Sequence, residues 1–167
     1  MRKPWNLPSY PFYSLITEKW DEINPQMEIL KESPRNMNIM TYVIPVSMSP
    51  KHYIIALYRD TQSLANWQMS HRGILQILAP THSSLVRVLG KKSWRSYDKM
   101  AYLAKKRLLT WEYHLIGISW YIELEEIEKL AGGDGDHILY LCRVVSSRSY
   151  HEKALNTGIL VEEGVIL

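Results

Sequence analysis

The residues of this chain best suited to binding chemistry are Arg59, Asp60 and Thr61, which directly follow an apolar run over residues 53–58. Threonine often begins a helix, because its hydroxyl accepts a hydrogen bond from an unpaired N–H group of the first turn. A helix start also carries a partial positive charge, to which a guanidinium adds a full charge and several donors. The triplet predicts a phosphate site, and a helix cap with a surface ion pair is an equally good interpretation.

A second set of small polar side chains accompanies the preceding apolar run, residues 39–46. Its members are Asn36, Asn38, Thr41 and Ser47. Polar groups in a buried strand need hydrogen-bond partners. Two interpretations stay open: the partners are neighbouring backbone groups, or they are the edge atoms of a flat heterocyclic ligand.

The usual catalytic and metal-binding signatures are missing from the sequence, including the Walker loop, GxGxxG, HExxH and CxxC. The six histidines are scattered without an i, i+4 pair, so we expect no metal site. The single cysteine, Cys142, forms no internal disulfide and indicates a reducing compartment. With neither a signal peptide nor an apolar run near ~18 residues, we expect a cytoplasmic protein without a membrane segment.

The formal net charge of +3 is too small to indicate nucleic-acid binding by itself. Residues 87–107 hold eight cations against one acid, Asp98. A nucleic-acid-binding barrel is the least favoured function, because these cations lack interleaved stacking aromatics. Lys91, Lys92 and Arg95 are candidates for the phosphates of a pyridine nucleotide, with a solvated loop as the alternative.

The hydrophobic pattern predicts a mainly β protein with inserted helices. The expected strands are residues 38–46, 53–58, 74–79, 111–118, 119–124 with 125–130 as a continuation, 138–145, and a closing hairpin of 159–161 and 165–167, with a further short strand at 26–32. The expected helices are residues 61–70 with Gly73 as the stop, 83–90 capped by Ser83 and Ser84, and 97–105 capped by Ser96. Short, numerous strands with polar turns are typical of a small antiparallel barrel.

The N-terminal segment differs from the rest of the chain. Pro4, Pro8 and Pro11 stand among aromatic residues, and proline disfavours a helix. We therefore expect residues 1–35 to be an extended arm that packs on the barrel or on a partner subunit. Residues 36–167 would then form the single barrel domain.

Several motifs, in this order, resemble the flavin reductase-like, FMN-binding split-barrel family. They are Asn36-Met37-Asn38, Thr41-Tyr42-Val43, Val46-Ser47-Met48-Ser49-Pro50, Thr61, and Gly135-Asp136-His137 followed by the run at 138–145. The resemblance covers about residues 35–165. It implies a six-stranded antiparallel split barrel, usually a homodimer with FMN at the subunit interface.

The resemblance also implies an FMN-dependent oxidoreductase, most simply a flavin reductase that uses NADH or NADPH. A non-enzymatic FMN-binding or electron-carrier protein is the alternative. Because the flavin performs the redox chemistry, no catalytic side chain is expected. The implied cofactor-binding residues are Asn38, Met40, Thr41, Tyr42, Ser47, Arg59, Asp60 and Thr61, and the implied substrate-binding residues are His137, Lys92 and Trp94.

Within this set, Met40, Thr41 and Tyr42 would line the flavin ring, and Ser47 would hold a turn or the ribityl chain. Arg59, Asp60 and Thr61 would surround the phosphate. The carboxylate of Asp60 would repel a phosphate unless it points away. His137 would lie near the nicotinamide, and Trp94 would cover the flavin face or obstruct the path of the cosubstrate.

Overall fold

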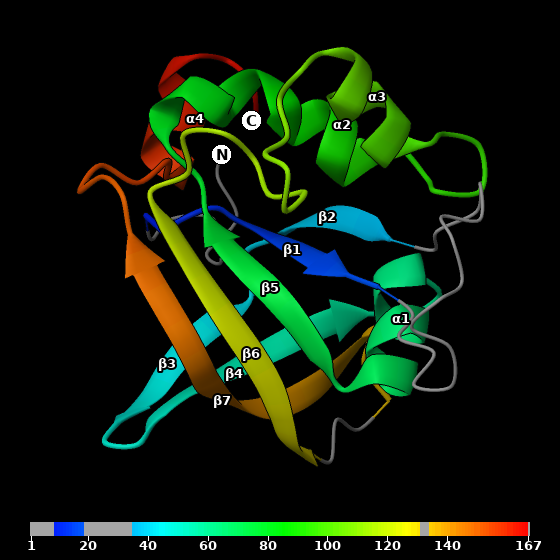
Figure 1. Cartoon of the computed structure of the whole chain (residues 1–167), viewed down its shortest axis with the longest axis vertical. Coiled ribbons are helices and arrows are strands. Elements are labelled where there is room, and N and C mark those ends of the chain that lie inside the picture. The colour runs from blue at the N-terminus through cyan, green and yellow to red at the C-terminus, as the bar shows by residue number, and fades with distance from the viewer. Residues whose placement is uncertain (1–8, 19–34, 131–133, 167) are drawn as a thin grey trace.

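The computed structural model describes residues 9–18, 35–130 and 134–166. Seven antiparallel strands form one curled sheet in the order β2-β1-β5-β6-β7-β4-β3 (Figure 1). The strands are β1 (Tyr13–Thr17), β2 (Asn36–Met40), β3 (Val43–Met48), β4 (Lys51–Tyr58), β5 (Arg72–Ile77), β6 (Trp120–Lys129) and β7 (His137–Ser149). The helices are α1 (Gln62–Ser70), the 3-10 helix η2 (Pro80–Leu85), α2 (Val86–Lys91), α3 (Lys99–Lys105) and α4 (Thr157–Glu162).

The sheet is split between its two end strands, β2 and β3, which only Thr41 and Tyr42 separate in the sequence. At this break the N–H group of Val43 donates to the carbonyl of Thr41 (3.1 Å), and that of Ala56 donates to the carbonyl of Tyr42 (3.0 Å). The expected mainly β split barrel is confirmed, with seven strands instead of six. The prediction of a single strand over 38–46 is wrong, because β2 ends at Met40 and β3 begins at Val43. The apolar pattern of the sequence continues across this break and therefore does not reveal it.

Two hydrophobic cores hold the structure together. One fills the barrel and contains Leu15, Ile55 and Leu75 together with Trp67 of α1, which closes one end of the barrel. The other lies between the sheet and the helices α2, α3 and α4, which lie together at the top of Figure 1. Within the described ranges, none of the helices has the length and apolar character needed to span a bilayer.

Helix α1 begins as the sequence predicts. The hydroxyl of Thr61 accepts a hydrogen bond from the N–H group of Leu64 (3.2 Å). The helix ends at His71, whose left-handed φ of 53° lets its N–H group donate to the carbonyl of Trp67 (2.7 Å). Gly73, the expected stop, lies in β5 instead.

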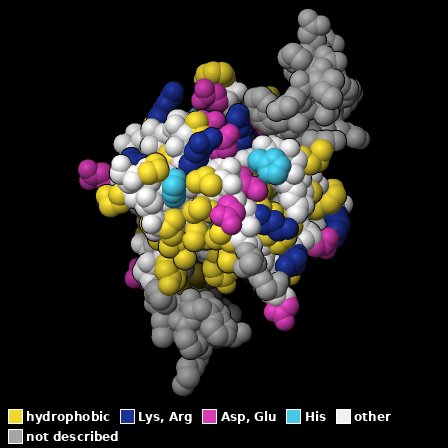
Figure 2. Space-filling view, turned by 90° about the horizontal axis from the view of Figure 1, so that it is seen from below, with side chains coloured by type: hydrophobic (Ala, Val, Ile, Leu, Met, Phe, Trp, Pro, Cys, Tyr) yellow, Lys and Arg dark blue, Asp and Glu magenta, His cyan; other side chains and the backbone are white. Residues whose placement is uncertain are grey.

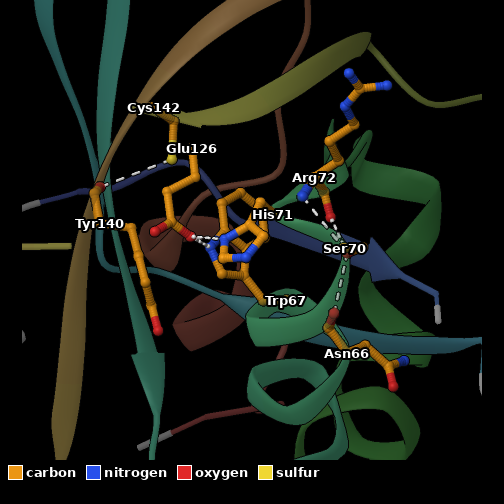
Figure 3. Close-up of polar contacts among 8 residues, drawn as sticks. All are labelled: Asn66, Trp67, Ser70, His71, Arg72, Glu126, Tyr140 and Cys142. Carbon is orange, nitrogen blue, oxygen red and sulfur yellow. Dashed lines mark hydrogen bonds and ion pairs between the residues drawn. The ribbon is translucent and has the colours of Figure 1, made fainter. Parts of the chain in front are cut away.

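A half-buried carboxylate fastens α1 to the sheet (Figure 3). The indole Nε1 of Trp67 donates to Oε2 of Glu126 at 2.7 Å, and Nδ1 of His71 lies 3.1 Å from the same oxygen. The buried indole also lies against the ring of Tyr140, with centroids 5.7 Å apart. This contact fixes the helix, and with it the position of Thr61 at its start.

The described part of the expected N-terminal arm is residues 9–18 and Arg35, and residues 9–18 contain a strand of the sheet. β1 is buried along its whole length and pairs with β2 on one side and β5 on the other. The rest of the arm, including the short strand expected at 26–32, lies outside the described residues. The boundary at residue 35 and a contact with a partner subunit stay predictions.

Two strand predictions in the C-terminal half are wrong. Residues 111–118 form turns with one isolated bridge between Leu109 and Leu115, because the N–H group of Leu115 is held by the side chain of Gln76 (2.8 Å) instead of by a strand. The expected closing hairpin is α4, followed by a tail that reaches Ile166 in the described chain. Asn156 caps α4 by accepting from the N–H group of Ile159 (3.0 Å), and Leu160 is buried against the other helices.

The two remaining helices begin at other residues than the expected serines. Ser83 and Ser84 lie inside η2, and α2 follows it directly. Asp98, not Ser96, caps α3, because its carboxylate accepts from the N–H group of Ala101 (2.8 Å).

Gly73 marks a close approach between β5, β1 and α1. A Cβ atom there would lie 2.9 Å from the carbonyl oxygen of Ile16 and 3.0 Å from the ring of Trp67. We expect Gly73→Ala to lower the free energy of unfolding by about 1–3 kcal/mol. Gly90→Ala in α2 is the matched control, because its nearest neighbour would be 3.7 Å away, and it should stabilise by ~0.5–1 kcal/mol. Urea unfolding measures the stability of both variants. Equal changes in the free energy of unfolding for Gly73→Ala and Gly90→Ala would contradict the expectation.

Candidate functional site

Two adjoining cavities form a groove across the break in the barrel. Their volumes are about 110 Å³ and about 700 Å³. Four residues line both cavities: Thr41, Tyr42, Ala56 and His137. The groove therefore joins the split between β2 and β3 to the outer face of β3, β4 and β7.

The small cavity is the polar end of the groove. It lies at the start of α1 and is lined by Asn38, Thr61 and Ser63 among others. The Nδ2 group of Asn36 donates to the hydroxyl oxygen of Ser63 (2.8 Å), which leaves the hydroxyl proton of Ser63 to donate elsewhere. Because β2 ends the sheet, one edge of its backbone has no strand partner among the described residues. These groups suit a compact ligand with hydrogen-bond acceptors.

The large cavity is the apolar end. Apolar residues of several elements line it: Phe12, Val43, Ile44, Ile54, Leu139, Val161 and Ile166. Its volume lies in the usual range for sites that enclose a small organic molecule. Figure 2 shows hydrophobic side chains gathered in one continuous area of the face seen from below. This end suits a large flat apolar ring.

His137 stands at the junction of the two cavities. Its ring makes edge-on contacts with the rings of Tyr42 and Tyr58, with centroid distances of 5.0 and 5.2 Å. Its Nδ1 lies 2.6 Å from a carboxylate oxygen of Asp136. This contact directs Nδ1 to the carboxylate and Nε2 away from it.

The structure brings about half of the predicted site residues together. Those that line the groove are Asn38, Met40, Thr41, Tyr42, Thr61 and His137. Those that line neither cavity are Ser47, Arg59, Asp60, Lys92 and Trp94. Sequence reasoning missed several lining residues, among them Ala56, Ser63 and Leu139. Strand alternation around Ile55 and Leu57 is the signal that could have placed Ala56 on the outer face.

Arg59 ties the start of α1 to the segment before His137. Its Nε donates to the carbonyl of Gly135 at 2.8 Å, and its backbone N–H donates to the carbonyl of Asp136 at 2.9 Å. The element containing Gly135, Asp136 and His137 is thereby held beside the helix that carries Thr61.

Asp60 lines neither cavity. It has a left-handed φ of 61°, and its carboxylate receives two hydrogen bonds from the guanidinium of Arg95, at 3.1 and 2.6 Å. The hydrogen bonds and the charge of Arg95 lower the pKa of Asp60 and keep it ionised. The pair therefore removes the expected repulsion toward an anion and holds the loop at residues 92–98 beside α1.

Lys99 is an unusual feature beside the polar end, because its side chain is buried, with a relative exposure of 4%. Its ammonium donates to Oδ1 of Asn38 (2.5 Å) and to the carbonyl of Leu89 (2.6 Å). Burial lowers the pKa of Lys99 to about 8. Lysine is almost never fully buried unless it is paired.

The lowered pKa of Lys99 makes stability depend on pH. Above pH ~8 the folded chain binds fewer protons at this group than the unfolded chain, in which lysine titrates near ~10.4, so stability should rise with pH across that window. The full effect is at most about 3 kcal/mol. Urea unfolding at pH 7, 8 and 9 measures the free energy of unfolding of the natural protein and of Lys99→Met. As the pH rises, we expect the stability of the natural protein to increase relative to that of Lys99→Met. A constant difference would contradict this assignment.

The comparison with known families decides the class of this protein. The model of the flavin reductase like domain matches residues 30–161. The chain belongs to the flavin reductase-like family. The predicted family is confirmed, and with it a flavin-binding oxidoreductase of this type. No curated protein matches the sequence.

Solved structures of flavin proteins share the fold of this flavin reductase-like chain. The styrene monooxygenase flavin reductase of Pseudomonas putida S12 is 14% identical, with a TM-score of 0.67 and coverage of 89% of this chain and 87% of that one. An FMN-binding protein of Thermus thermophilus is 17% identical, with a TM-score of 0.67 and coverage of 93% and 85%. An NADH:FAD oxidoreductase of Streptomyces globisporus C-1027 is 13% identical, with a TM-score of 0.65 and coverage of 87% and 79%.

Proposed function

We propose that this flavin reductase-like protein binds FMN in the groove and reduces it with NADH or NADPH. The observation that supports the proposal is the polarity of the groove, which has a compact polar end at the start of α1 and a large apolar end. FMN has the same division, with a phosphate at one end and a flat tricyclic ring at the other.

The proposed orientation follows from the lining. The phosphate and ribityl chain lie at the small cavity, near Asn38, Thr61 and Ser63, and the ring lies toward the large cavity beside Thr41 and Tyr42. One relative is named as an FMN-binding protein and another as an NADH:FAD oxidoreductase. We favour FMN over FAD because the polar end, at about 110 Å³, suits a single phosphate.

When bound, the flavin supplies the ring that accepts a hydride. The chain supplies binding, orientation and shielding from water. His137 lies at the junction of the cavities and is oriented by Asp136, and in this proposal it would orient a cosubstrate over the ring. Arg59 would add charge near the phosphate end, and Lys92 and Trp94 would contact the cosubstrate from the loop that Arg95 holds beside α1. Ser47 on β3 has no assigned contact in this proposal.

We also propose a homodimer through the outer face of β3, β4 and β7. On the end strand β3, Ile44, Val46 and Met48 have relative exposures of 59%, 46% and 90%. Exposed apolar side chains grouped on an end strand are typical of a protein interface. A second copy on this face would cover the mouth of the large cavity. Val46→Lys should then give monomers in sedimentation, whereas an unchanged sedimentation coefficient would argue against this interface. A cytoplasmic location stays a prediction.

The visible spectrum tests the proposed function. Purified protein, or protein mixed with FMN, should show bound flavin bands, and the bands should bleach when NADH or NADPH is added without oxygen. Protein that neither carries nor takes up flavin would overturn the proposal. Flavin that binds but is bleached by neither nucleotide would favour the electron-carrier alternative.

A further inference from the structure

The cation of Lys99 has only neutral partners in the part of the chain that the structure describes. Both of its hydrogen bonds go to uncharged oxygens, on Asn38 and Leu89, and no carboxylate there lies within ion-pair distance. The carbonyl of Leu89 belongs to the last turn of α2, where carbonyl groups carry a partial negative charge. A buried charge is costly when no opposite charge accompanies it.

The lysine also fixes the orientation of the Asn38 side chain. An ammonium group only donates hydrogen bonds, so the amide oxygen of Asn38 must face Lys99. The amide NH₂ group then points away from Lys99. Asn38 lines the small cavity, so the charge of Lys99 lies one side chain away from that cavity.

The opposite wall of the small cavity also favours an anion. Thr61 and Ser63, at the start of α1, line it there, and that end of the helix carries the positive end of its dipole. None of the described residues that line the small cavity is acidic. Asp60 is paired with Arg95, and Asp136, which lines the adjoining large cavity, lies against Nδ1 of His137.

We propose that Lys99 is a positioning residue that acts through Asn38 and makes the small cavity selective for a phosphate-bearing flavin, FMN, over uncharged riboflavin. The inference rests on the proposed function and adds a specificity determinant to it. The phosphate provides the opposite charge that the buried lysine lacks, and the Asn38 amide donates to the phosphate or to the adjoining ribityl oxygens.

The first test measures FMN and riboflavin affinities of the natural protein and of Lys99→Met, by quenching of flavin fluorescence. We expect FMN binding to weaken at least about tenfold and riboflavin binding to change less than about twofold. Lys105→Met, the same substitution at an exposed position of the same helix, should leave both affinities unchanged. A purely structural role for Lys99 would weaken both flavins equally and overturn the inference.

The second test keeps the lysine and supplies the missing charge. Asn38→Asp preserves the side-chain volume and places a carboxylate against Lys99. We expect a higher unfolding temperature together with a loss of the preference for FMN, a combination that damage to the fold would not produce. This variant decides the question even if Lys99→Met does not fold. An unchanged ratio of FMN to riboflavin affinity would overturn the inference.

The two proposals fail in different ways. If the natural protein binds neither flavin, the proposed function and the inference both fall. If it binds FMN and riboflavin equally, only the inference falls.

Discussion

Ala56→Trp should abolish FMN binding while the barrel stays folded. Ala56 lines both cavities, and its side chain lies on the outer face of β4, opposite the buried neighbours Ile55 and Leu57. An indole at this position would occupy the junction of the groove, where the polar and the ring-bearing parts of the ligand must be continuous. The backbone hydrogen bond from Ala56 to Tyr42 does not involve the side chain and is retained.

We expect the FMN affinity of Ala56→Trp to fall by ~100-fold or more, equivalent to ~2.7 kcal/mol. Fluorescence titration measures the affinity, and circular dichroism with thermal unfolding confirms that the barrel is intact. Ala65→Trp is the matched control, because Ala65 is exposed on α1 and lines neither cavity. A folded Ala56→Trp variant with the natural affinity would place the flavin elsewhere.

The largest loss of stability should follow Trp67→Ala. The indole is fully buried in the barrel core, packs on Tyr140, and bonds to Glu126 (Figure 3). Its removal leaves a large cavity and a carboxylate without its indole donor. We expect a decrease of about 3–5 kcal/mol in the free energy of unfolding, out of a total that is ~5–15 kcal/mol for a typical domain.

Trp67→Phe separates packing from hydrogen bonding. This variant keeps an aromatic ring in the core but removes the donor to Glu126, so we expect a loss of ~1–3 kcal/mol. Urea unfolding of both variants measures the two contributions. A loss below ~1 kcal/mol in Trp67→Ala would mean that the contact does not fasten α1 to the sheet.

The sequence was sufficient to predict an element wherever that element is determined by its own residues. Thr61 predicts the start of α1, because a hydroxyl acts on an N–H group only three residues away. The apolar run at 138–145 predicts the centre of β7, whose side chains alternate between the core and the outer face. The order of the motifs between Asn36 and His137 was also sufficient to identify the family, which the match over residues 30–161 confirms.

The same signals failed where the path of the chain depends on distant partners. The apolar run at 39–46 gives no indication that Thr41 and Tyr42 carry the chain from one end of the sheet to the other. The apolar residues around Leu160 fit a strand or a helix equally well, and burial against the other helices decides for α4.

The sequence by itself therefore determined the family and the type of fold, and about half of the site residues that it predicted line the groove. Tertiary structure alone decided that Arg59 bonds to Gly135 and that Asp60 bonds to Arg95. It also decided that Lys99, which the sequence shows only as one cation of a basic run, is buried and bonds to Asn38. The reason is physical: residue type and spacing limit which hydrogen bonds a side chain can form, but the partner depends on which distant segment folding brings within about 3 Å.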